Sequence, residues 1–464
     1  MKTRIVLLLA LTAIMDNSWA EANNDPLILN STDQIIVRYH PKPTEGNAIA
    51  FIKHGATYGG FGVAAGKIRD VLEIGAHLDI DDVTSLSKGL EDDPQVAYAE
   101  PDLIMQTLRV PNDTRYNEQW HYFEPTAGIN MPEAWDITTG HPAVVAAVID
   151  TGMTDHQDIK ANLVPGYDFI SNAWSANDGD GWDNNPSDMG DSIQPGDCGA
   201  SGGILIPMNA NPSSWHGVHV MGTIGAISNN GLDVAGVSWQ SRVMPLRALG
   251  RCGGYLSDIV SAMEHAAGSR KGRLRKVPKS PHIVSVVNMS LGGEALGCPR
   301  SYQDAIDLLV ANNITVVVAA GNERRHVAFS TPANCRNVIV VGAINRRANL
   351  SLYSNFGHQV DISAPGGETQ LQGNGILSLS NSGLTSQGIN TLSYYQGTSM
   401  AAPHVTGVIA LSYAINPEIS PQRREALLKK TARPFPGGST CYKSRCGAGI
   451  IDAVAFLRAV QREP

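Results

Sequence analysis

The sequence predicts an α/β protein whose main domain is a doubly wound, mostly parallel sheet, preceded by a small α+β unit. Short apolar runs rich in valine, isoleucine and alanine alternate with helical patterns from residue 143 onward, which is typical of parallel strands buried on both faces. Chemically suggestive residues follow several of these runs, at the strand ends where sheets of this class bind ligands. A polar linker around Pro111 separates this domain from an earlier stretch with its own strand pattern.

The first expected element is a secretory signal peptide at residues 1–20. Two cations precede an apolar run at 5–15, and small residues stand at Ser18 and Ala20. The apolar run is much shorter than the roughly 20 residues that span a bilayer as a helix. We therefore expect a secreted, extracellular protein with no membrane anchor in its mature form.

Residues 21–109 are expected to form the small α+β unit. Its expected strands are 35–39 and 74–80, and a helix begins near Asp81. The main domain is placed at 110–464. Its expected strands are residues 143–149, 242–248, 283–289, 314–319 and 338–341.

The charge pattern argues against two classes of partner. The formal net charge is −8 at pH 7, and the lysines and arginines are scattered along the chain. Neither a nucleic-acid groove nor binding to an anionic membrane surface is therefore expected. One basic run, at 270–279, is interpreted as a solvated loop before a strand that begins at His282.

The cysteines form an even set behind an export signal, so we expect disulfides. Zinc ligation is the alternative, but the sequence has no Cys-x-x-Cys pair. Six cysteines allow 15 pairings, and the spacing alone does not choose among them. They are Cys198, Cys252, Cys298, Cys335, Cys441 and Cys446.

Asp150 ends an apolar strand in the segment Ala147-Val-Ile-Asp-Thr-Gly152. A carboxylate is costly to bury there unless it has a hydrogen-bonding partner. A helix N-cap or a turn residue is the alternative interpretation. The same tripeptide marks aspartic proteases, but those need two such carboxylates, and no second Asp-Thr-Gly or Asp-Ser-Gly follows an apolar strand.

His216 begins a segment with small residues on one helical face, Trp215-His-Gly-Val-His-Val-Met-Gly-Thr223. Two histidines three residues apart could form a metal pair. The helical metalloprotease pattern is His-Glu-x-x-His, however, and no acidic residue lies between these two. Zinc is therefore not expected here.

Ser399 lies where a glycine-rich turn leads into a helix of small residues, Gly397-Thr-Ser-Met-Ala-Ala-Pro-His-Val-Thr-Gly407. An N-cap is the ordinary role of such a serine. A serine on a tight turn beside a helix N-terminus also suits a nucleophile in acyl transfer. Ala401 stands where the Gly-x-Ser-x-Gly elbow of α/β-hydrolases needs its second glycine, so that motif is not matched. Asn322 follows another strand, and its amide is suited to donate to an oxyanion.

In chain order the four blocks around Asp150, His216, Asn322 and Ser399 resemble the subtilisin family of serine peptidases, over about residues 120–460. The resemblance implies a subtilisin-like fold and an endopeptidase that acts on proteins and peptides. It implies that Ser399 is the nucleophile, with His216 moving the proton and Asp150 orienting His216. Asn322 and the Ser399 N–H would hold the oxyanion.

The resemblance also implies a substrate-binding edge and an inhibitory propeptide. Ser290, Leu291 and Gly292 would pair with the substrate backbone. Residues 21–109 would be the propeptide, an intramolecular inhibitor of a monomeric zymogen that is cut between about 107 and 112. The alternatives are a catalytically inactive relative that only binds polypeptides and an enzyme of the sedolisin type, which pairs its serine with acidic residues. The intact triad and the context of His216 argue against both.

The resemblance favours the disulfides Cys198–Cys252, Cys298–Cys335 and Cys441–Cys446. The histidine block departs from the family pattern at Val218 and Met221, where a threonine and an alanine are usual. Neither change removes a reacting group, so they bear on the shape of the pocket rather than on the chemistry.

The acidic loop at 177–191 is expected to bind a structural Ca²⁺. It holds five aspartates among glycines, and Ca²⁺ accepts an irregular shell of oxygens. A merely solvated loop is the alternative, since no EF-hand pattern ending in glutamate is present. The family resemblance adds Asp158. The expected ligands are Asp158, Asp178, Asp180, Asp183, Asp188 and Asp191.

Overall fold

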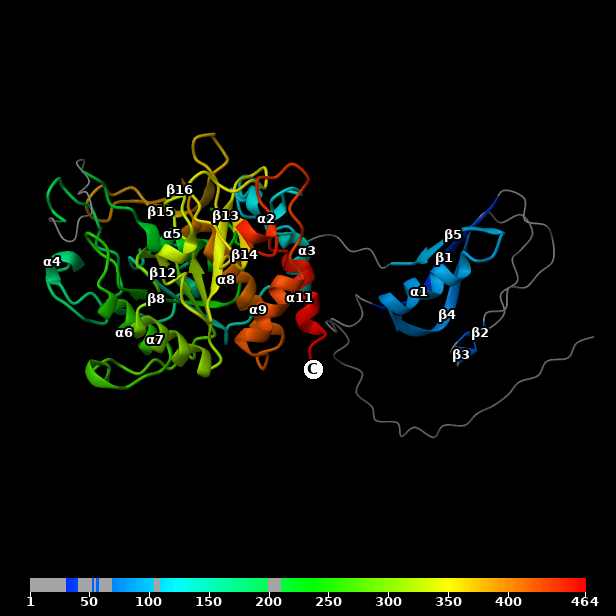
Figure 1. The fold of residues 1–464 in the computed structure, drawn as a ribbon, viewed down its shortest axis with the longest axis horizontal. Helices are drawn as coiled ribbons and strands as arrows, with labels where there is room; N and C mark the ends of the chain where they lie inside the picture. The colour runs from blue at the N-terminus through cyan, green and yellow to red at the C-terminus, as the bar shows by residue number, and fades with distance from the viewer. Residues whose placement is uncertain (1–30, 41–51, 54–55, 58–68, 104–108, 199–209) are drawn as a thin grey trace, which may run out of the picture. The chain divides into compact units, whose positions relative to one another are not determined.

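A computed structural model describes residues 31–40, 52–53, 56–57, 69–103, 109–198 and 210–464. The chain divides into two compact units, Met1–Thr107 and Leu108–Pro464 (Figure 1). The expected signal peptide lies outside the described residues. In the part of the chain that the structure describes, no helix is both long and apolar enough to cross a membrane.

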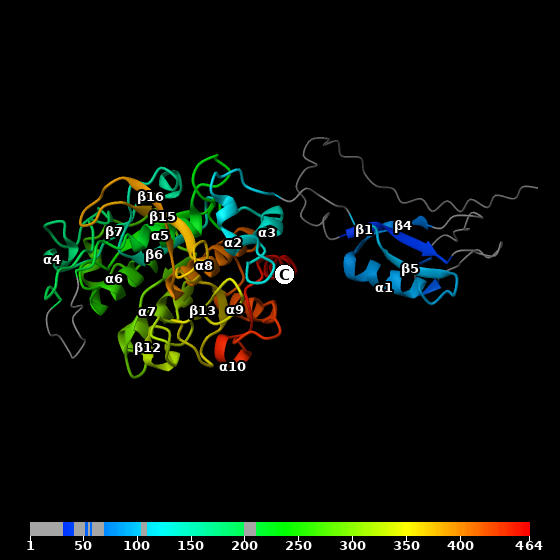
Figure 2. The same ribbon diagram turned by 90° about the horizontal axis from the view of Figure 1, so that it is seen from above.

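The first unit contains a three-stranded antiparallel sheet covered by one helix. Its elements are β1 (Ser31–Tyr39), β4 (Arg69–Asp79), α1 (Ile80–Leu90) and β5 (Val96–Pro101), with the strand order β4-β1-β5. Helix α1 lies along one face of the sheet (Figure 2), where Val83 packs with Val37 and Val96 in a small apolar core. Two further short strands, β2 (Ile52–Lys53) and β3 (Ala56–Thr57), pair antiparallel.

The second unit is built on a seven-stranded sheet in which every neighbouring pair is parallel. The order is β14-β13-β11-β9-β6-β8-β7. These strands are β6 (Val145–Asp150), β7 (Tyr167–Asp168), β8 (Arg242–Arg247), β9 (Val286–Met289), β11 (Thr315–Ala319), β13 (Ile339–Ile344) and β14 (Ile362–Pro365). The predicted doubly wound α/β fold is thereby confirmed.

Alternate residues of each central strand enter two separate cores. In β6, Ala146 and Val148 belong to one core, whereas Ala147 and Ile149 belong to the other. The first core is covered by α3 (Met131–Ile137), α5 (His216–Gly225), α8 (Thr398–Ile415), α9 (Pro421–Lys430) and α11 (Ala453–Gln461). The second is covered by α6 (Leu256–Ala266) and α7 (Arg300–Ala311), which lie side by side in both ribbon views (Figures 1 and 2). Burial of both faces explains why the strands are apolar throughout.

The remaining elements are short and lie outside the main sheet. They are α2 (Trp120–Phe123), α4 (Ala173–Ala176), α10 (Lys443–Cys446), the antiparallel pair β10 (Gly293–Glu294) and β12 (Ser330–Thr331), and the hairpin β15 (Ile376–Asn381) with β16 (Asn390–Tyr395).

One strand begins later than predicted. The sequence places its start at residue 282 or 283, whereas β9 begins at Val286. The side chain of Ile283 is 83% exposed and belongs to the loop that follows the basic run. The prediction of the strand start was wrong because an exposed apolar residue precedes the strand.

Candidate active site

The carboxyl end of β6 places Asp150 in the middle of the sheet, between β8 and β9. His216 is the first residue of α5, and Ser399 lies in the first turn of α8. Helix α5 packs against α8, so the segments of these three residues meet above the same sheet edge. Parallel strands bind ligands at this edge because their connections diverge there.

Asp150 and His216 form a hydrogen-bonded pair. His216 Nδ1 lies 2.8 Å from Asp150 Oδ1, and the same carboxylate oxygen accepts the Thr151 N–H at 2.7 Å. The Asp150 side chain is 1% exposed, whereas that of His216 is 23% exposed. When the neutral imidazole donates its Nδ1–H to Asp150, Nε2 keeps its lone pair and can act as a base.

The pKa of His216 lies above its ordinary value. Burial lowers this pKa, but the charge and hydrogen bond of Asp150 and the charges of Asp191 and Asp188 together outweigh it. A negative charge nearby favours the imidazolium, which is the form that this base takes after it accepts a proton.

Ser399 and Ser290 exchange hydrogen bonds. Ser399 Oγ donates to the Ser290 carbonyl at 3.2 Å, and Ser290 Oγ donates to the Ser399 carbonyl at 2.8 Å. Within the described residues, no hydrogen bond joins Ser399 Oγ to His216. Catalytic hydrogen bonds often tighten only when substrate is bound, so the present orientation of the hydroxyl is compatible with a nucleophile.

The amide of Asn322 is held in one orientation. Its Oδ1 accepts from the Thr398 N–H at 2.9 Å and from the Thr398 hydroxyl at 3.0 Å, so its Nδ2 is directed away from Thr398 and is available as a donor. The preceding Gly321 has a φ of +102°, and a Cβ there would lie 2.3 Å from Asn355 Nδ2. Glycine is therefore required at the turn that presents Asn322.

The expected substrate-binding edge follows β9 directly. Ser290 is buried, Leu291 is half-buried and Gly292 is exposed. Asn288 donates to Ser290 Oγ at 2.9 Å and accepts from Thr406 of α8 at 2.8 Å. These bonds fix the edge relative to the helix that carries Ser399.

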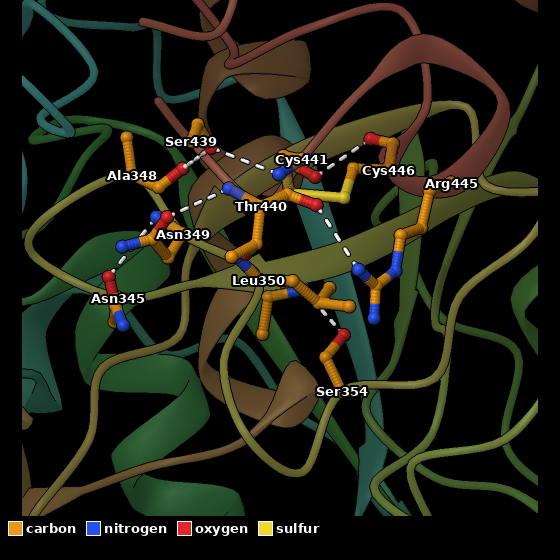
Figure 3. The surroundings of a disulfide bond; sticks show 12 residues. Asn345, Ala348, Asn349, Leu350, Ser354, Ser439, Thr440, Cys441, Arg445 and Cys446 are labelled. Carbon is orange, nitrogen blue, oxygen red and sulfur yellow. Dashed lines mark hydrogen bonds between the residues drawn. A yellow bond between two sulfur atoms is a disulfide. The ribbon is translucent and has the colours of Figure 1, made fainter. Parts of the chain in front are cut away.

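All six cysteines are paired as the resemblance implied. The disulfides are Cys198–Cys252, Cys298–Cys335 and Cys441–Cys446. Figure 3 shows the last of them beside the turn that contains Asn349. Thr440 donates its N–H to Asn349 and accepts the Leu350 N–H, so this small loop is attached to the chain between β13 and β14.

The expected calcium ligands do not converge. The part of the chain that the structure describes contains no group of three or more metal-ligating side chains. Asp158 lies apart from the loop and accepts from Asn230 and from the Val234 N–H, and burial raises its pKa to about 7. Asp183 and Asp178 each accept a backbone N–H within the loop, the latter from Asp180. The six aspartates therefore do not converge on one point in the described residues, and their role as calcium ligands stays a prediction.

A buried arginine forms ion pairs with one aspartate of the acidic loop and with Asp168 of β7. Arg247, the last residue of β8, is 1% exposed and forms ion pairs with Asp168 and with Asp178, the latter at 2.7 Å. It also donates to the carbonyls of Ala176 and Thr151. Arg247 was not among the residues predicted from the sequence. An arginine within an otherwise buried apolar run was the available signal, because a buried charge needs a partner.

The other two loop aspartates face the start of α5. Asp188 Oδ2 accepts from the Thr151 hydroxyl at 2.6 Å, and burial raises the pKa of Asp188 to about 7. Asp191 accepts from the N–H and the hydroxyl of Ser214 at 2.6 and 2.7 Å. Both residues, which the sequence predicts as metal ligands, are hydrogen-bonded to residues that contact the first turn of α5.

The part of the chain that contains these residues is similar to known proteins. A family model described as the subtilase family matches residues 141–449. An extracellular protease of Xanthomonas campestris pv. campestris is 45% identical over 383 residues, which are 82% of this chain and 62% of that protein. An extracellular basic protease of Dichelobacter nodosus is 40% identical over 390 residues, which are 83% of this chain and 60% of that protein.

The chain is also similar to a protease whose structure has been solved. A protease of Pseudoalteromonas arctica has a TM-score of 0.70 and 43% sequence identity, and the match covers 76% of this chain and all of that one. The chain thus spans less than two thirds of the length of the two curated relatives, but it corresponds to the whole of the solved chain.

Proposed function

Because the chain belongs to the subtilase family of serine peptidases, we propose that it is a secreted endopeptidase that cleaves proteins and peptides through an acyl-enzyme intermediate. The observation that carries the proposal is the 2.8 Å hydrogen bond between His216 Nδ1 and Asp150, on a helix packed against the one that begins at Thr398 and presents Ser399. No observation favours an inactive polypeptide-binding relative.

In the proposed reaction the Ser399 hydroxyl turns from the Ser290 carbonyl to His216 Nε2. As Oγ bonds to the scissile carbonyl carbon, its proton passes to Nε2, and Asp150 stabilises the imidazolium that results. The imidazolium then gives this proton to the amine as the C–N bond breaks. In the second half of the reaction, water gives a proton to His216 Nε2 as its oxygen bonds to the acyl carbon. The proton then passes to Ser399 Oγ as the bond between Oγ and the acyl carbon breaks, which releases the acid and restores the enzyme.

The oxyanion is proposed to lie between two donors. One is Asn322 Nδ2, whose orientation follows from the bonds of its Oδ1 to Thr398. The other is the Ser399 N–H, which lies in the first turn of α8, where a backbone N–H has no acceptor within the helix. Neither donor brings a charge that must be desolvated before the reaction.

An extended substrate is proposed to pair with the backbone of Ser290, Leu291 and Gly292. Main-chain hydrogen bonds along such an edge are independent of the substrate sequence, so this edge supports cleavage of many polypeptides. A monomer carries all of these groups on one chain.

The proposed maturation removes a signal peptide at 1–20 and a propeptide at 21–109. The antiparallel sheet and helix of the first unit support a folded propeptide, which would act as an intramolecular inhibitor until it is cut. The N-terminus of the secreted enzyme, determined by mass spectrometry, tests this: a start between 107 and 112 is expected.

Binding of Ca²⁺ by the mature enzyme stays a prediction without an assigned ligand set. Its measurement is thermal unfolding of the inhibited enzyme with and without the ion. A ligand that binds the folded state alone raises the melting temperature as its concentration rises.

The decisive test of the proposed function is Ser399→Ala. The variant should fold, fail to cut its own precursor and lose hydrolysis of a protein substrate, because only the nucleophile is removed. The wild type should be labelled by a fluorophosphonate on a serine, and the variant should not. Ser257→Ala, at an exposed serine of α6, is the matched control and should behave as wild type. Hydrolysis by a pure Ser399→Ala enzyme would contradict the assignment.

A further inference from the structure

The start of helix α5 needs acceptors from outside the helix. The first N–H groups of any helix have no partner within it, and Trp215, the residue before His216, provides no side-chain cap and has a left-handed φ of 48°. The position of the His216 ring depends on how this first turn is held.

One carboxylate reaches the turn through a threonine hydroxyl. Asp188 Oδ2 accepts from Thr151 Oγ1 at 2.6 Å, and Thr151 Oγ1 in turn accepts the Gly217 N–H at 2.9 Å. Asp188 is itself fixed, because its Oδ1 accepts the Gly190 N–H at 2.9 Å and its N–H donates to the Met153 carbonyl. Gly217 is required there, since a Cβ would lie 2.3 Å from the Gly152 carbonyl.

A second carboxylate reaches the same turn through a serine hydroxyl. Asp191 Oδ2 accepts from Ser214 Oγ at 2.7 Å, and Ser214 Oγ accepts the His216 N–H at 3.3 Å. Tyr395 donates its hydroxyl to the Ser214 carbonyl at 2.6 Å. Two aspartates, each through one hydroxyl, therefore satisfy consecutive N–H groups at the positive end of the helix.

We propose that Asp188 and Asp191 are positioning residues for His216, and that they act through Thr151 and Ser214 respectively. Each fixes one N–H of the turn that carries the imidazole, and the charged form of each raises the pKa of His216. The acidic loop therefore supports the catalytic histidine through two hydroxyl groups. This inference rests on the proposed function.

The charged and titratable groups around His216 come from four elements. Asp150 ends β6, His219 belongs to α5, Tyr395 belongs to β16, and Asp188 and Asp191 come from the acidic loop. Burial lowers the pKa of His219 to about 3 and raises that of Tyr395, so neither is charged near neutral pH. The charges that raise the pKa of His216 are therefore those of Asp150, Asp191 and, in its ionised form, Asp188, whose own pKa is about 7.

The test compares Asp188→Asn and Asp191→Asn with Asp180→Asn, an exposed residue of the same loop that does not reach α5. We expect kcat to fall by about 10-fold in each of the first two with KM little changed, because misplacing a catalytic group weakens the transition state. The acid limb of kcat/KM should move to lower pH by roughly half a unit in Asp191→Asn, since the lost charge favoured the imidazolium. The movement should be smaller in Asp188→Asn, because burial raises the pKa of Asp188 to about 7 and leaves it largely uncharged along this limb. Asp180→Asn should match the wild type.

A double-mutant cycle of Asp188 and Thr151 tests whether Asp188 acts through the Thr151 hydroxyl or only through a general structural effect. Thr151→Val should reproduce the loss in Asp188→Asn, the double variant should lose little more than either single one, and Thr151→Ser should restore most of the rate. If Asp188→Asn does not fold, Ser214→Ala and the Thr151 pair carry the same test.

The two proposals fail differently. A wild-type enzyme without serine-dependent hydrolysis overturns the proposed function. An active wild type whose kcat and acid limb are shared by Asp188→Asn, Asp191→Asn and Asp180→Asn overturns the positioning roles alone. If the losses of kcat in Asp188→Asn and Thr151→Val are additive in the double variant, Asp188 does not act through Thr151, and that part of the proposal is overturned.

Discussion

Strands β6 and β8 end side by side on residues of opposite charge. Asp150 and Arg247 are paired in the register, and each is 1% exposed. Arg247 donates to two carboxylates and two carbonyls. Asp150 uses Oδ1 for His216 and Thr151, whereas its buried Oδ2 has no partner among the described residues. Each side-chain nitrogen of Arg247 thus has a partner, whereas Asp150 Oδ2 is an exception to the rule that buried polar atoms are hydrogen-bonded. We relate the first to stability and the second to the proposed catalytic role of Asp150.

The largest effect that would sharpen this comparison is expected from Asp150→Asn. The asparagine can still accept the Thr151 N–H, but it favours the wrong tautomer of His216, so kcat should fall by about 10⁴-fold. The free energy of unfolding should change little. Asp155→Asn, at an exposed carboxylate, is the control. A loss of kcat below about 10-fold would contradict the assigned role.

Arg247→Met should show the opposite profile. Removing one partner of a buried ion pair leaves Asp168 uncompensated, so the free energy of unfolding should fall by about 3–5 kcal/mol. Urea unfolding in the Ser399→Ala background measures this without self-digestion. Arg275→Met, at an exposed arginine, should change stability by less than about 0.5 kcal/mol. Equal stability of the two variants would break the comparison.

Asn322→Ala, with the smallest expected effect, tests whether a neutral side chain with one polar atom left unbonded also acts in catalysis. Its Oδ1 is satisfied by Thr398 and its Nδ2 is free for the oxyanion. We expect kcat to fall by about 10²- to 10³-fold with little change in KM, since this donor acts on charge that develops in the transition state. Asn312→Ala, at an exposed position between α7 and the amino end of β11, is the control. A change confined to KM would assign Asn322 to substrate binding instead.

The four candidate catalytic residues were identified from the resemblance of the blocks around them to the subtilisin family, and each block also has a local pattern that places its residue at the end of a strand or the start of a helix. Asp150 and Asn322 come after apolar strands, and His216 and Ser399 begin helices of small residues. Strand β7 was not predicted, because two residues are too short to show a period. Strand β14 was not predicted, because Ser363 and Pro365 interrupt its apolar pattern.

The roles of the aspartates could not be predicted from spacing. Asp178 is 69 residues from Arg247, and Asp188 is 37 residues from Thr151. Local crowding of carboxylates suggested a metal, whereas Asp178 pairs with an arginine of β8 and Asp188 with the hydroxyl of the residue after β6. Partners that only the tertiary fold brings together leave no mark on the spacing within one loop.

The pairing of Arg247 with Asp168 and Asp178 also decides how the acidic loop responds to dilution. A dissociable ion stabilises a fold by RT ln(1 + [L]/Kd), so its benefit vanishes when the medium runs out of it. A guanidinium on the neighbouring strand cannot diffuse away, and its effective concentration is set by the backbone. This part of the molecule therefore keeps its neutralising charge whatever chelators or salts surround it.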